Sequence, residues 1–382
     1  MKIVRKNLKI FHVIVGLNVG GAETMLKRLI ESDVENIPHT VVVSLTSLGI
    51  IGESLRTCGV RVHALGMSSP FDFPIAFGRL IRLLRQYKPT IVQTWMYHAN
   101  LLGGLAARMT GSCSIVWGLH STSIPQGELS VTFWLVRLGA IFSYIIPSRI
   151  ICCANSAKVA HAKLGYSAHK MIVVPNGYDF YAFERDLKSR ARARLEFGFD
   201  DGDIVIGTVG RFDPLKDFHN FVIAASNLVA RRDNVKFLMI GRNIEWTNPI
   251  LRGWIEDAGL VKKFQLLGEQ SDVPYFLSAM DVFCLSSVNE AFPNVVVEAM
   301  AMGLPCVVTR AGDAADILGD DAFVVPVKDP VSLSAALLRI CDLASEERRR
   351  LGERGAKKVR AEYGIENIRQ KYEAVYAEIA RK

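Results

Sequence analysis

Short apolar runs alternate along the chain with segments in which apolar residues recur at helical spacing. The runs are continuous, which is typical of strands buried on both faces of a parallel sheet. Strands are predicted at residues 10–15, 39–44, 90–94, 114–117, 150–153, 171–174, 204–209, 236–240, 264–267, 281–285, 306–309 and 323–327. This alternation predicts an α/β protein with doubly wound parallel sheets.

The segments between these runs have the periodicity of amphipathic helices. Helices are predicted at residues 22–31, 73–86, 100–109, 156–164, 188–196, 219–231, 248–258, 273–279, 294–302, 330–343 and 346–363, with a bend at Gly364 before a last helix at about 365–382. With 382 residues the chain can form two ordinary domains. The turn cluster from Pro175 to Asp179 precedes a charged helix, so we place the boundary there, between residues 1–177 and 178–364.

The charge is unevenly distributed. Apolar residues make up 50% of the chain and charged residues 22%, as in soluble globular proteins. The net charge is +8, but residues 1–176 carry 18 Lys and Arg against 7 Asp and Glu. A basic N-terminal half predicts an anionic partner, either a phosphorylated substrate or an anionic membrane. No basic motif with interleaved aromatic residues is present, so we expect no nucleic acid.

Two segments bear on membrane contact. Residues 129–151 form the most apolar long stretch, but Arg137, Pro147 and Arg149 interrupt it below the length of a spanning helix, about 20 residues. We interpret it as a largely buried helix that leads into the strand at 150–153, and the alternative is a partly exposed helix lying on a membrane. The second segment is a basic stretch that could face anionic lipid, with Arg79, Arg82, Arg85, Lys88 and Arg108.

The cysteines and the N-terminus indicate the compartment. Seven scattered cysteines, an odd number, argue against a disulfide framework and favour a reducing compartment. Cys152 and Cys153 lie in an apolar run and are expected in the core. A basic start, residues 1–9, precedes a short apolar run without a cleavage site, so we predict a first strand and not a signal peptide. The expected location is the cytoplasm, with contact to the inner face of its membrane as an open alternative.

The stretch from Glu290 to Glu298 is the strongest candidate for chemistry. Glu290 follows a predicted strand on a loop, and Pro293 suits the first turn of the next helix, which carries Glu298. In an open α/β sheet this loop lies at the carboxyl ends of the strands, where ligands bind. The N–H groups of residues 292–295 would favour an anion. Either glutamate alone would be typical of a solvated surface.

Other candidates also follow predicted strands. Gly210 and Arg211 come after the strand at 204–209, and Lys216 lies five residues further on, so both cations could converge on one diphosphate. Gly20 and Gly21 lie between a strand and a helix, where they cradle a phosphate or only make a tight turn. Their spacing is not that of a dinucleotide-binding loop.

These motifs resemble those of retaining glycosyltransferases with the GT-B fold. The resemblance rests on Glu290-x7-Glu298 followed by Ala-Met-Ala-Met-Gly-Leu-Pro, and on Gly210-Arg211-x4-Lys216. It implies two doubly wound Rossmann-like domains facing across a cleft, with the last helix, about 365–382, crossing back to the first domain. The first domain would bind the acceptor and the second the nucleotide sugar.

The resemblance also implies roles for individual residues. Arg211 and Lys216 would neutralise the leaving diphosphate, Glu290 would bind sugar hydroxyls, Glu298 the ribose diol, and His120 the donor sugar or its phosphate. The remaining donor-binding residues would be Gly20, Gly21, Gly210, Gly268, Val273, Phe292, Pro293, Asn294 and Val295. A metal site and a cofactor are not expected, since the nucleotide sugar is a co-substrate.

The resemblance suggests a UDP-sugar donor and a glycan or polyprenyl-diphosphate-linked acceptor, as in bacterial polysaccharide and lipopolysaccharide synthesis. Two alternatives from other classes remain. One is a nucleotide-sugar epimerase of similar fold, which needs no acceptor, and the other is a non-catalytic subunit that binds the nucleotide sugar.

Overall fold

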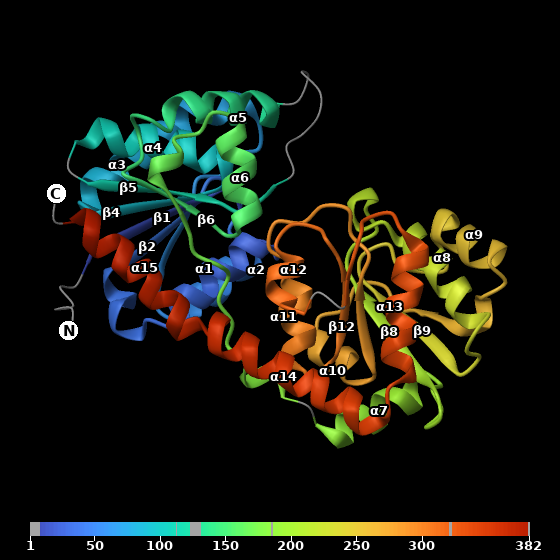
Figure 1. The fold of residues 1–382 in the computed structure, drawn as a ribbon. Helices are drawn as coiled ribbons and strands as arrows, with labels where there is room; N and C mark the ends of the chain where they lie inside the picture. The colour runs from blue at the N-terminus through green and yellow to red at the C-terminus, as the bar shows by residue number, and fades with distance from the viewer. Residues whose placement is uncertain (1–7, 112, 123–130, 185, 321–322, 381–382) are drawn as a thin grey trace. The chain divides into compact units, whose positions relative to one another are not determined.

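The computed structural model describes residues 8–111, 113–122, 131–184, 186–320 and 323–380 (Figure 1). The basic start at residues 1–7 lies outside this part of the chain. The chain divides into two compact units. Unit 1 comprises Met1–Asp179 and Tyr363–Lys382, and unit 2 comprises Phe180–Glu362.

Unit 1 is built on a parallel sheet of seven strands in the order β3-β2-β1-β4-β5-β6-β7. The strands are β1 Ile10–Ile14, β2 Thr40–Ser44, β3 Arg61–Ala64, β4 Ile91–Trp95, β5 Ser114–Leu119, β6 Arg149–Cys152 and β7 Met171–Val173. The strand order reverses between β1 and β4, which creates the switch point where such sheets bind ligands. Cys152 and Cys153 are buried, so their prediction as core residues is confirmed. β3 was not predicted.

The helices of unit 1 cover both faces of this sheet. They are α1 Gly21–Glu31, α2 Gly49–Thr57, α3 Phe73–Tyr87, α4 Met96–Thr110, α5 Val131–Phe142, α6 Asn155–Lys163 and α15 Ile365–Ala380. α4 packs against both α3 and α5 on one face, and α1 packs against α15 on the other (Figure 1). Of these helices, α2 was not predicted.

The last helix, α15, belongs to unit 1, as predicted. Its apolar face, including Ile368 and Tyr372, joins the core formed by β1 and α1. The Tyr372 ring stacks over Trp95, with 6.2 Å between ring centroids. The backbone of Tyr178 holds the start of the helix, since its N–H donates to Tyr363 and its carbonyl accepts from Ile365.

The prediction that the apolar segment at 129–151 is largely buried was wrong. In α5 only Val136, Gly139 and Ala140 are buried, while Trp134 and Ile141 are 55% and 67% exposed. The helix packs on α4 by one face, and because apolar residues lie on all its sides, with Arg137 as its one charge, periodicity could not show which face that is. Residues 129 and 130 lie outside the described part. In the chain as described, no helix is long and apolar enough to cross a membrane.

Unit 2 repeats the topology of unit 1. Its six parallel strands have the order β10-β9-β8-β11-β12-β13, with the switch point between β8 and β11. The strands are β8 Ile204–Val209, β9 Val235–Ile240, β10 Phe264–Leu266, β11 Val282–Leu285, β12 Cys306–Thr309 and β13 Val324–Val325. All six were predicted, although β13 is shorter than expected. The shared strand order confirms that each half forms a Rossmann-like sheet.

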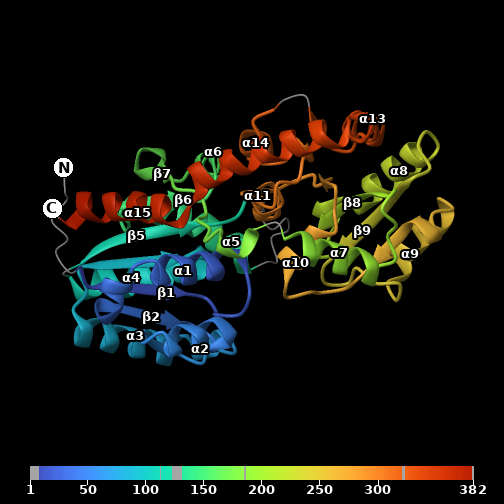
Figure 2. The same cartoon turned by 90° about the horizontal axis from the view of Figure 1, so that it is seen from below.

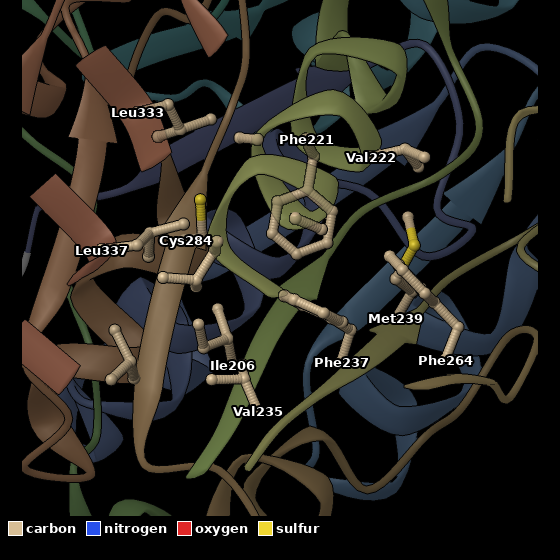
Figure 3. Close-up of a cluster of buried hydrophobic side chains, with 14 of the residues drawn as sticks. Ile206, Phe221, Val222, Val235, Phe237, Met239, Phe264, Cys284, Leu333 and Leu337 are labelled. Atoms are coloured by element: carbon tan, nitrogen blue, oxygen red, sulfur yellow. The ribbon is translucent and has the colours of Figure 1, made fainter. Parts of the chain in front are cut away.

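The core of unit 2 lies between this sheet and its helices. The helices are α7 Leu187–Glu196, α8 Phe218–Val229, α9 Pro249–Asp257, α10 Val273–Ser278, α11 Asn294–Ala301, α12 Ala314–Leu318, α13 Pro330–Asp342 and α14 Ser345–Tyr363. α8 and α13 pack against each other (Figure 2). They cover a hydrophobic cluster that contains Phe221, Phe237 and Leu337 (Figure 3). The short α12 was not predicted.

Gly207 provides a test of packing in this sheet. It lies in β8, and a Cβ at this position would collide with the sulfur of Met280. We expect Gly207→Ala to lower the free energy of unfolding by about 1–3 kcal/mol, the usual cost of overpacking a core. Gly253→Ala in α9 is the matched control, because nothing lies within 4 Å of the added methyl. There the higher helix propensity of Ala should raise stability by about 0.5–1 kcal/mol. Urea denaturation measures the free energy of unfolding of both variants. Equal changes in the two variants would contradict the close packing of Met280 against Gly207.

Candidate functional site

Two loops meet at the switch point of unit 2. One follows β8 and contains the 3₁₀ turn Pro214–Lys216, and the other follows β11 and leads to Glu290. The Ser286 hydroxyl donates to the Lys216 carbonyl at 2.8 Å, and the Val288 N–H donates to the Leu215 carbonyl at 2.8 Å. These bonds fix the two loops to each other, so the structure brings together two candidates that are 74 residues apart in sequence.

Lys216 and Glu290 form an ion pair at the centre of this site. The Lys216 ammonium donates to Glu290 Oε1 at 2.6 Å, and the Ser287 hydroxyl donates to the same oxygen at 2.6 Å. The side chains are 20% and 13% exposed, so both charges are partly withdrawn from water. Sequence reasoning treated the two residues separately and missed Ser287. The position of Ser287 just after β11 could have indicated that it belongs to the site.

Arg211 is held on the same loop by a different carboxylate. Its Nε donates to Asp213 Oδ2 at 2.9 Å, and its Nη2 lies 2.9 Å from the same oxygen. Asp213 also accepts from the Leu215 N–H, which caps the 3₁₀ turn. Burial opposes ionisation of Asp213, but the Leu215 N–H, Arg211 and Lys216 outweigh it and lower its pKa. Asp213 therefore keeps its charge at neutral pH and orients the guanidinium, which is 57% exposed.

Glycines allow the neighbouring loops to approach. Gly241, after β9, has φ of 144°, and a Cβ there would collide with the carbonyl of Gly210. The Gly241 N–H donates to the Gly268 carbonyl at 2.7 Å. Gly210 and Gly268, both predicted site residues, are thus brought together through Gly241, which sequence reasoning did not assign to the site. Val273 lies further on, at the first position of α10.

The loop after β12 supports the Glu290 loop. Gly312 has φ of 56°, and a Cβ at this position would collide with the Glu290 carbonyl. The Asp313 N–H donates to the Ala291 carbonyl at 3.1 Å, and the Thr309 hydroxyl donates to the Ser287 carbonyl at 2.5 Å. Positive φ at Gly312 favours glycine over any other residue. These supports escaped sequence reasoning because they are long-range contacts.

The helix α11 begins at Asn294, beside this loop. Pro293 precedes the helix as its N-cap, so its predicted place inside the first turn was wrong by one residue. Phe292 and Pro293 are buried, while Asn294, Val295 and Glu298 are partly exposed. A helix N-terminus carries partial positive charge and, with Arg211 and Lys216 nearby in the same unit, suits an anion of high charge.

The predicted residues of unit 1 lie at the carboxyl edge of its own sheet. Gly20 caps α1 and Gly21 begins it. The Glu23 carboxylate lies against Gly20, because a Cβ at Gly20 would collide with its Oε2, and burial raises the pKa of Glu23. A negative charge at this helix terminus would oppose a diphosphate beside the glycines. The predicted contact is therefore conditional on Glu23 moving or being protonated.

His120 follows β5 and stacks on Trp95, with 5.0 Å between ring centroids. Burial lowers its pKa to about 4, although the Asn176 side chain acts in the opposite direction. Both ring nitrogens are buried, and neither forms a hydrogen bond of normal geometry within the described structure. His120 is therefore neutral at physiological pH and can offer one donor and one acceptor.

Within the described residues, no group of three or more His, Cys, Asp or Glu side chains is placed to hold a metal ion. The switch point of unit 2 brings together Arg211, Lys216 and the carboxylates of Asp213 and Glu290 that pair with them.

Comparison with known proteins points to one family. Residues 189–358 match the family model described as glycosyl transferases group 1, and residues 19–180 match that described as glycosyltransferase family 4. A UDP-Gal:alpha-D-GlcNAc-diphosphoundecaprenol alpha-1,3-galactosyltransferase of Escherichia coli is 29% identical over 269 residues, 69% of each chain. The capsular polysaccharide biosynthesis glycosyltransferase CapM of Staphylococcus aureus is 26% identical, over 78% of this chain and 79% of its own.

A solved structure extends the likeness to the whole fold. Anabaena HepE, crystallised with UDP and glucose, superposes with a TM-score of 0.84 at 18% identity. The match covers 97% of this chain and 100% of HepE.

The Lys216–Glu290 pair gives a test of this geometry. Removing either partner leaves the other charge partly buried, so we expect Lys216→Met and Glu290→Gln each to lower the free energy of unfolding. The double variant should lose less than the sum of the two, with a coupling energy of about 0.5–3 kcal/mol in a double-mutant cycle. The exposed pair Arg349–Glu353 on α14 serves as control, with an expected coupling of about 0.5 kcal/mol or less. Equal coupling energies in the two cycles would contradict the partly buried ion pair between Lys216 and Glu290.

Proposed function

The chain belongs to the glycosyl transferases group 1 and has the GT-B fold, and on that premise we propose that it transfers a sugar from a nucleotide-diphosphate sugar with retention of configuration. The proposed acceptor is a glycan or a lipid-linked glycan in the synthesis of cell-surface polysaccharide. The proposal assigns the donor to residues 178–364 and the acceptor to residues 1–177. Retention follows from the family resemblance alone.

The observation that carries the proposal is the group of charges at the switch point of unit 2. Lys216 has three N–H donors, of which one goes to Glu290, so the others can reach phosphate oxygens. Arg211, oriented by Asp213, offers a planar fork to the same diphosphate. Breaking the anomeric bond develops negative charge on the departing diphosphate. Fixed cations stabilise that charge more in the transition state than in the bound donor.

The remaining residues have proposed binding roles around this centre. Glu290 accepts from sugar hydroxyls and Glu298 from the ribose diol, since a carboxylate suits two vicinal hydroxyls. The N-terminus of α11 contributes its partial charge through residues 292–295. Gly210, Gly268 and Val273 hold the nucleotide by close backbone approach. His120, neutral by its lowered pKa, would hydrogen-bond the sugar or its phosphate without adding a charge.

UDP is the favoured nucleotide. The Escherichia coli relative is named for UDP-Gal and a diphosphoundecaprenol acceptor, and Anabaena HepE was crystallised with UDP. A polyprenyl-diphosphate-linked acceptor is proposed on the same basis. Epimerase and non-catalytic subunit are not favoured, because the matched families and relatives are glycosyltransferases.

The roles of Arg211 and Lys216 can be tested without knowing the acceptor. UDP released by slow donor hydrolysis is measured across a panel of UDP-sugars, and the best donor is kept. We expect Arg211→Ala and Lys216→Ala each to lower kcat/KM for that donor by roughly 10²–10³, the cost of removing one charge-stabilising donor. Arg252→Ala on α9 is the control, because Arg252 is an exposed arginine of the same unit. Wild-type kinetics in both site variants would overturn the diphosphate assignment.

The proposal also makes the reaction independent of added metal. Side-chain cations would neutralise the leaving diphosphate, so excess EDTA should leave the rate of UDP release unchanged. The measurement compares initial rates with and without chelator, followed by addition of Mn²⁺ or Mg²⁺. Loss of activity on chelation and recovery with either ion would show that a metal supplies the charge instead.

A further inference from the structure

The outer face of α5 carries large apolar side chains where a surface helix normally carries polar ones. Val131, Trp134, Leu138 and Ile141 lie on this face, and Tyr144 and Ile145 continue it in the following turn. All six are between 42% and 67% exposed. We call this set the apolar ridge. α5 has 12 residues and is about 18 Å long, so the ridge is an extended surface feature.

The inner face of α5 is tightly packed, so the helix cannot rotate to bury the ridge. A Cβ at Gly139 would collide with the Tyr166 hydroxyl, and a Cβ at Gly104 in α4 would lie 2.8 Å from the Ile146 side chain. These close approaches fix both the helix and the turn that follows it. The exposure of the ridge is therefore a property of the folded unit.

Cations lie on α5 itself and at one end of the ridge. The Arg137 guanidinium lies over the Phe133 ring, 5.4 Å from its centroid, on α5 itself. At the other end the Lys170 ammonium donates to the carbonyls of Ser143 and Tyr144, at 3.1 and 2.5 Å. Burial and the positive charges of Arg108 and Arg149 lower the pKa of Lys170, so further cations lie near this end, although Arg149 itself pairs with Glu378 of α15.

The excess of basic over acidic residues extends over the helices that lie on the same side of the sheet as α5. From Phe73 to Tyr178 the chain contains ten Lys and Arg and a single acidic residue, Glu128, which lies outside the described residues. This stretch forms α3, α4, α5 and α6. On α3 the side chains of Arg79, Arg82 and Arg85 are exposed, in line with the predicted basic stretch, and exposed Phe73 and Ile75 precede them.

The opposite face of the same sheet has an ordinary solvated surface. Lys27 pairs with Glu31 on α1 at 3.3 Å, and Arg369 pairs with Glu366 and Glu373 on α15. Such i,i+4 and i,i+3 pairs are typical of helices that face water. The paired charges on α1 and α15 thus contrast with the exposed apolar side chains and the excess of cations on the α3–α5 side.

We propose that the outer face of α3, α4 and α5 binds an anionic lipid surface, with the apolar ridge entering the interface and the basic side chains contacting headgroups. A lipid surface takes up apolar side chains and attracts cations at once. A second copy of the chain is a poorer occupant, because a two-fold contact on this face would oppose cations to cations.

This inference goes beyond the proposed function, since it rests on the surface of unit 1 alone. It would stand even with a soluble acceptor. With a lipid-linked acceptor, it would hold the protein at the surface where that acceptor is found.

Vesicle co-sedimentation of the full chain tests the proposal. The expected result is binding to phosphatidylcholine vesicles that contain phosphatidylglycerol, weaker binding as salt rises, and weak binding to pure phosphatidylcholine. A ridge variant with Trp134→Ser, Ile141→Ser and Ile145→Ser should lower the partition coefficient by about tenfold or more. A charge variant with Arg79→Gln, Arg82→Gln and Arg85→Gln should lower it and reduce its salt dependence.

The matched control replaces exposed apolar residues of unit 2, Leu195→Ser, Ile250→Ser and Val331→Ser, which are 83%, 55% and 70% exposed. This variant should bind as the wild type does. Thermal unfolding checks that each variant is folded, and rates of donor hydrolysis should be equal in the ridge variant and the wild type. If the wild type hydrolyses no donor, the proposed function is refuted. Vesicle binding still tests the lipid-surface proposal in that case, because the two measurements are independent.

Three outcomes would overturn the inference. They are no binding to anionic vesicles at low salt, equal binding to neutral vesicles, and equal loss in the ridge and control variants. A wild-type dimer in sedimentation equilibrium that the ridge variant converts to a monomer, without vesicle binding, would identify a second copy as the occupant instead.

Discussion

The ion pair between Lys216 and Glu290 is the constraint on which the candidate site depends. It joins the loops after β8 and β11, the two strands that flank the switch point of unit 2. Because both side chains are mostly buried, neither charge could be left alone without a large desolvation cost. The backbone bonds from Ser286 and Val288 hold the loops so that the pair can form.

The same pair sets what the site can do. A lysine already held by a carboxylate is fixed in position before a ligand arrives, so stabilisation of developing charge requires little reorganisation. Arg211 differs, since it is more than half exposed and oriented only by Asp213. The proposed diphosphate site therefore combines one fixed cation with one that stays accessible. Gly241 and Gly312 make this arrangement possible because any larger residue would displace the loops.

Unit 1 shows how similar apolar sequences serve different purposes. The runs in β1 and β4 are buried on both faces of the sheet, as continuous apolar strands should be. α5 is equally apolar, yet only one of its faces is buried. Its exposed face lies in a layer nearly devoid of acidic residues, which gives a surface suited to anionic lipid, and the other face of the sheet carries paired charges.

The sequence by itself determined every strand except β3, most of the helices and the position of each candidate loop after a strand, because burial on both sides imposes continuous apolar runs and glycine and proline mark the turns. It also indicated Arg211, Lys216, Glu290 and Glu298 as charged residues in such loops. Only the tertiary structure decided that Lys216 pairs with Glu290, that Ser287 and Gly312 support them, and that α5 exposes its apolar face. These depend on contacts between residues far apart in the chain, and local periodicity carries no information about which distant surface a side chain meets.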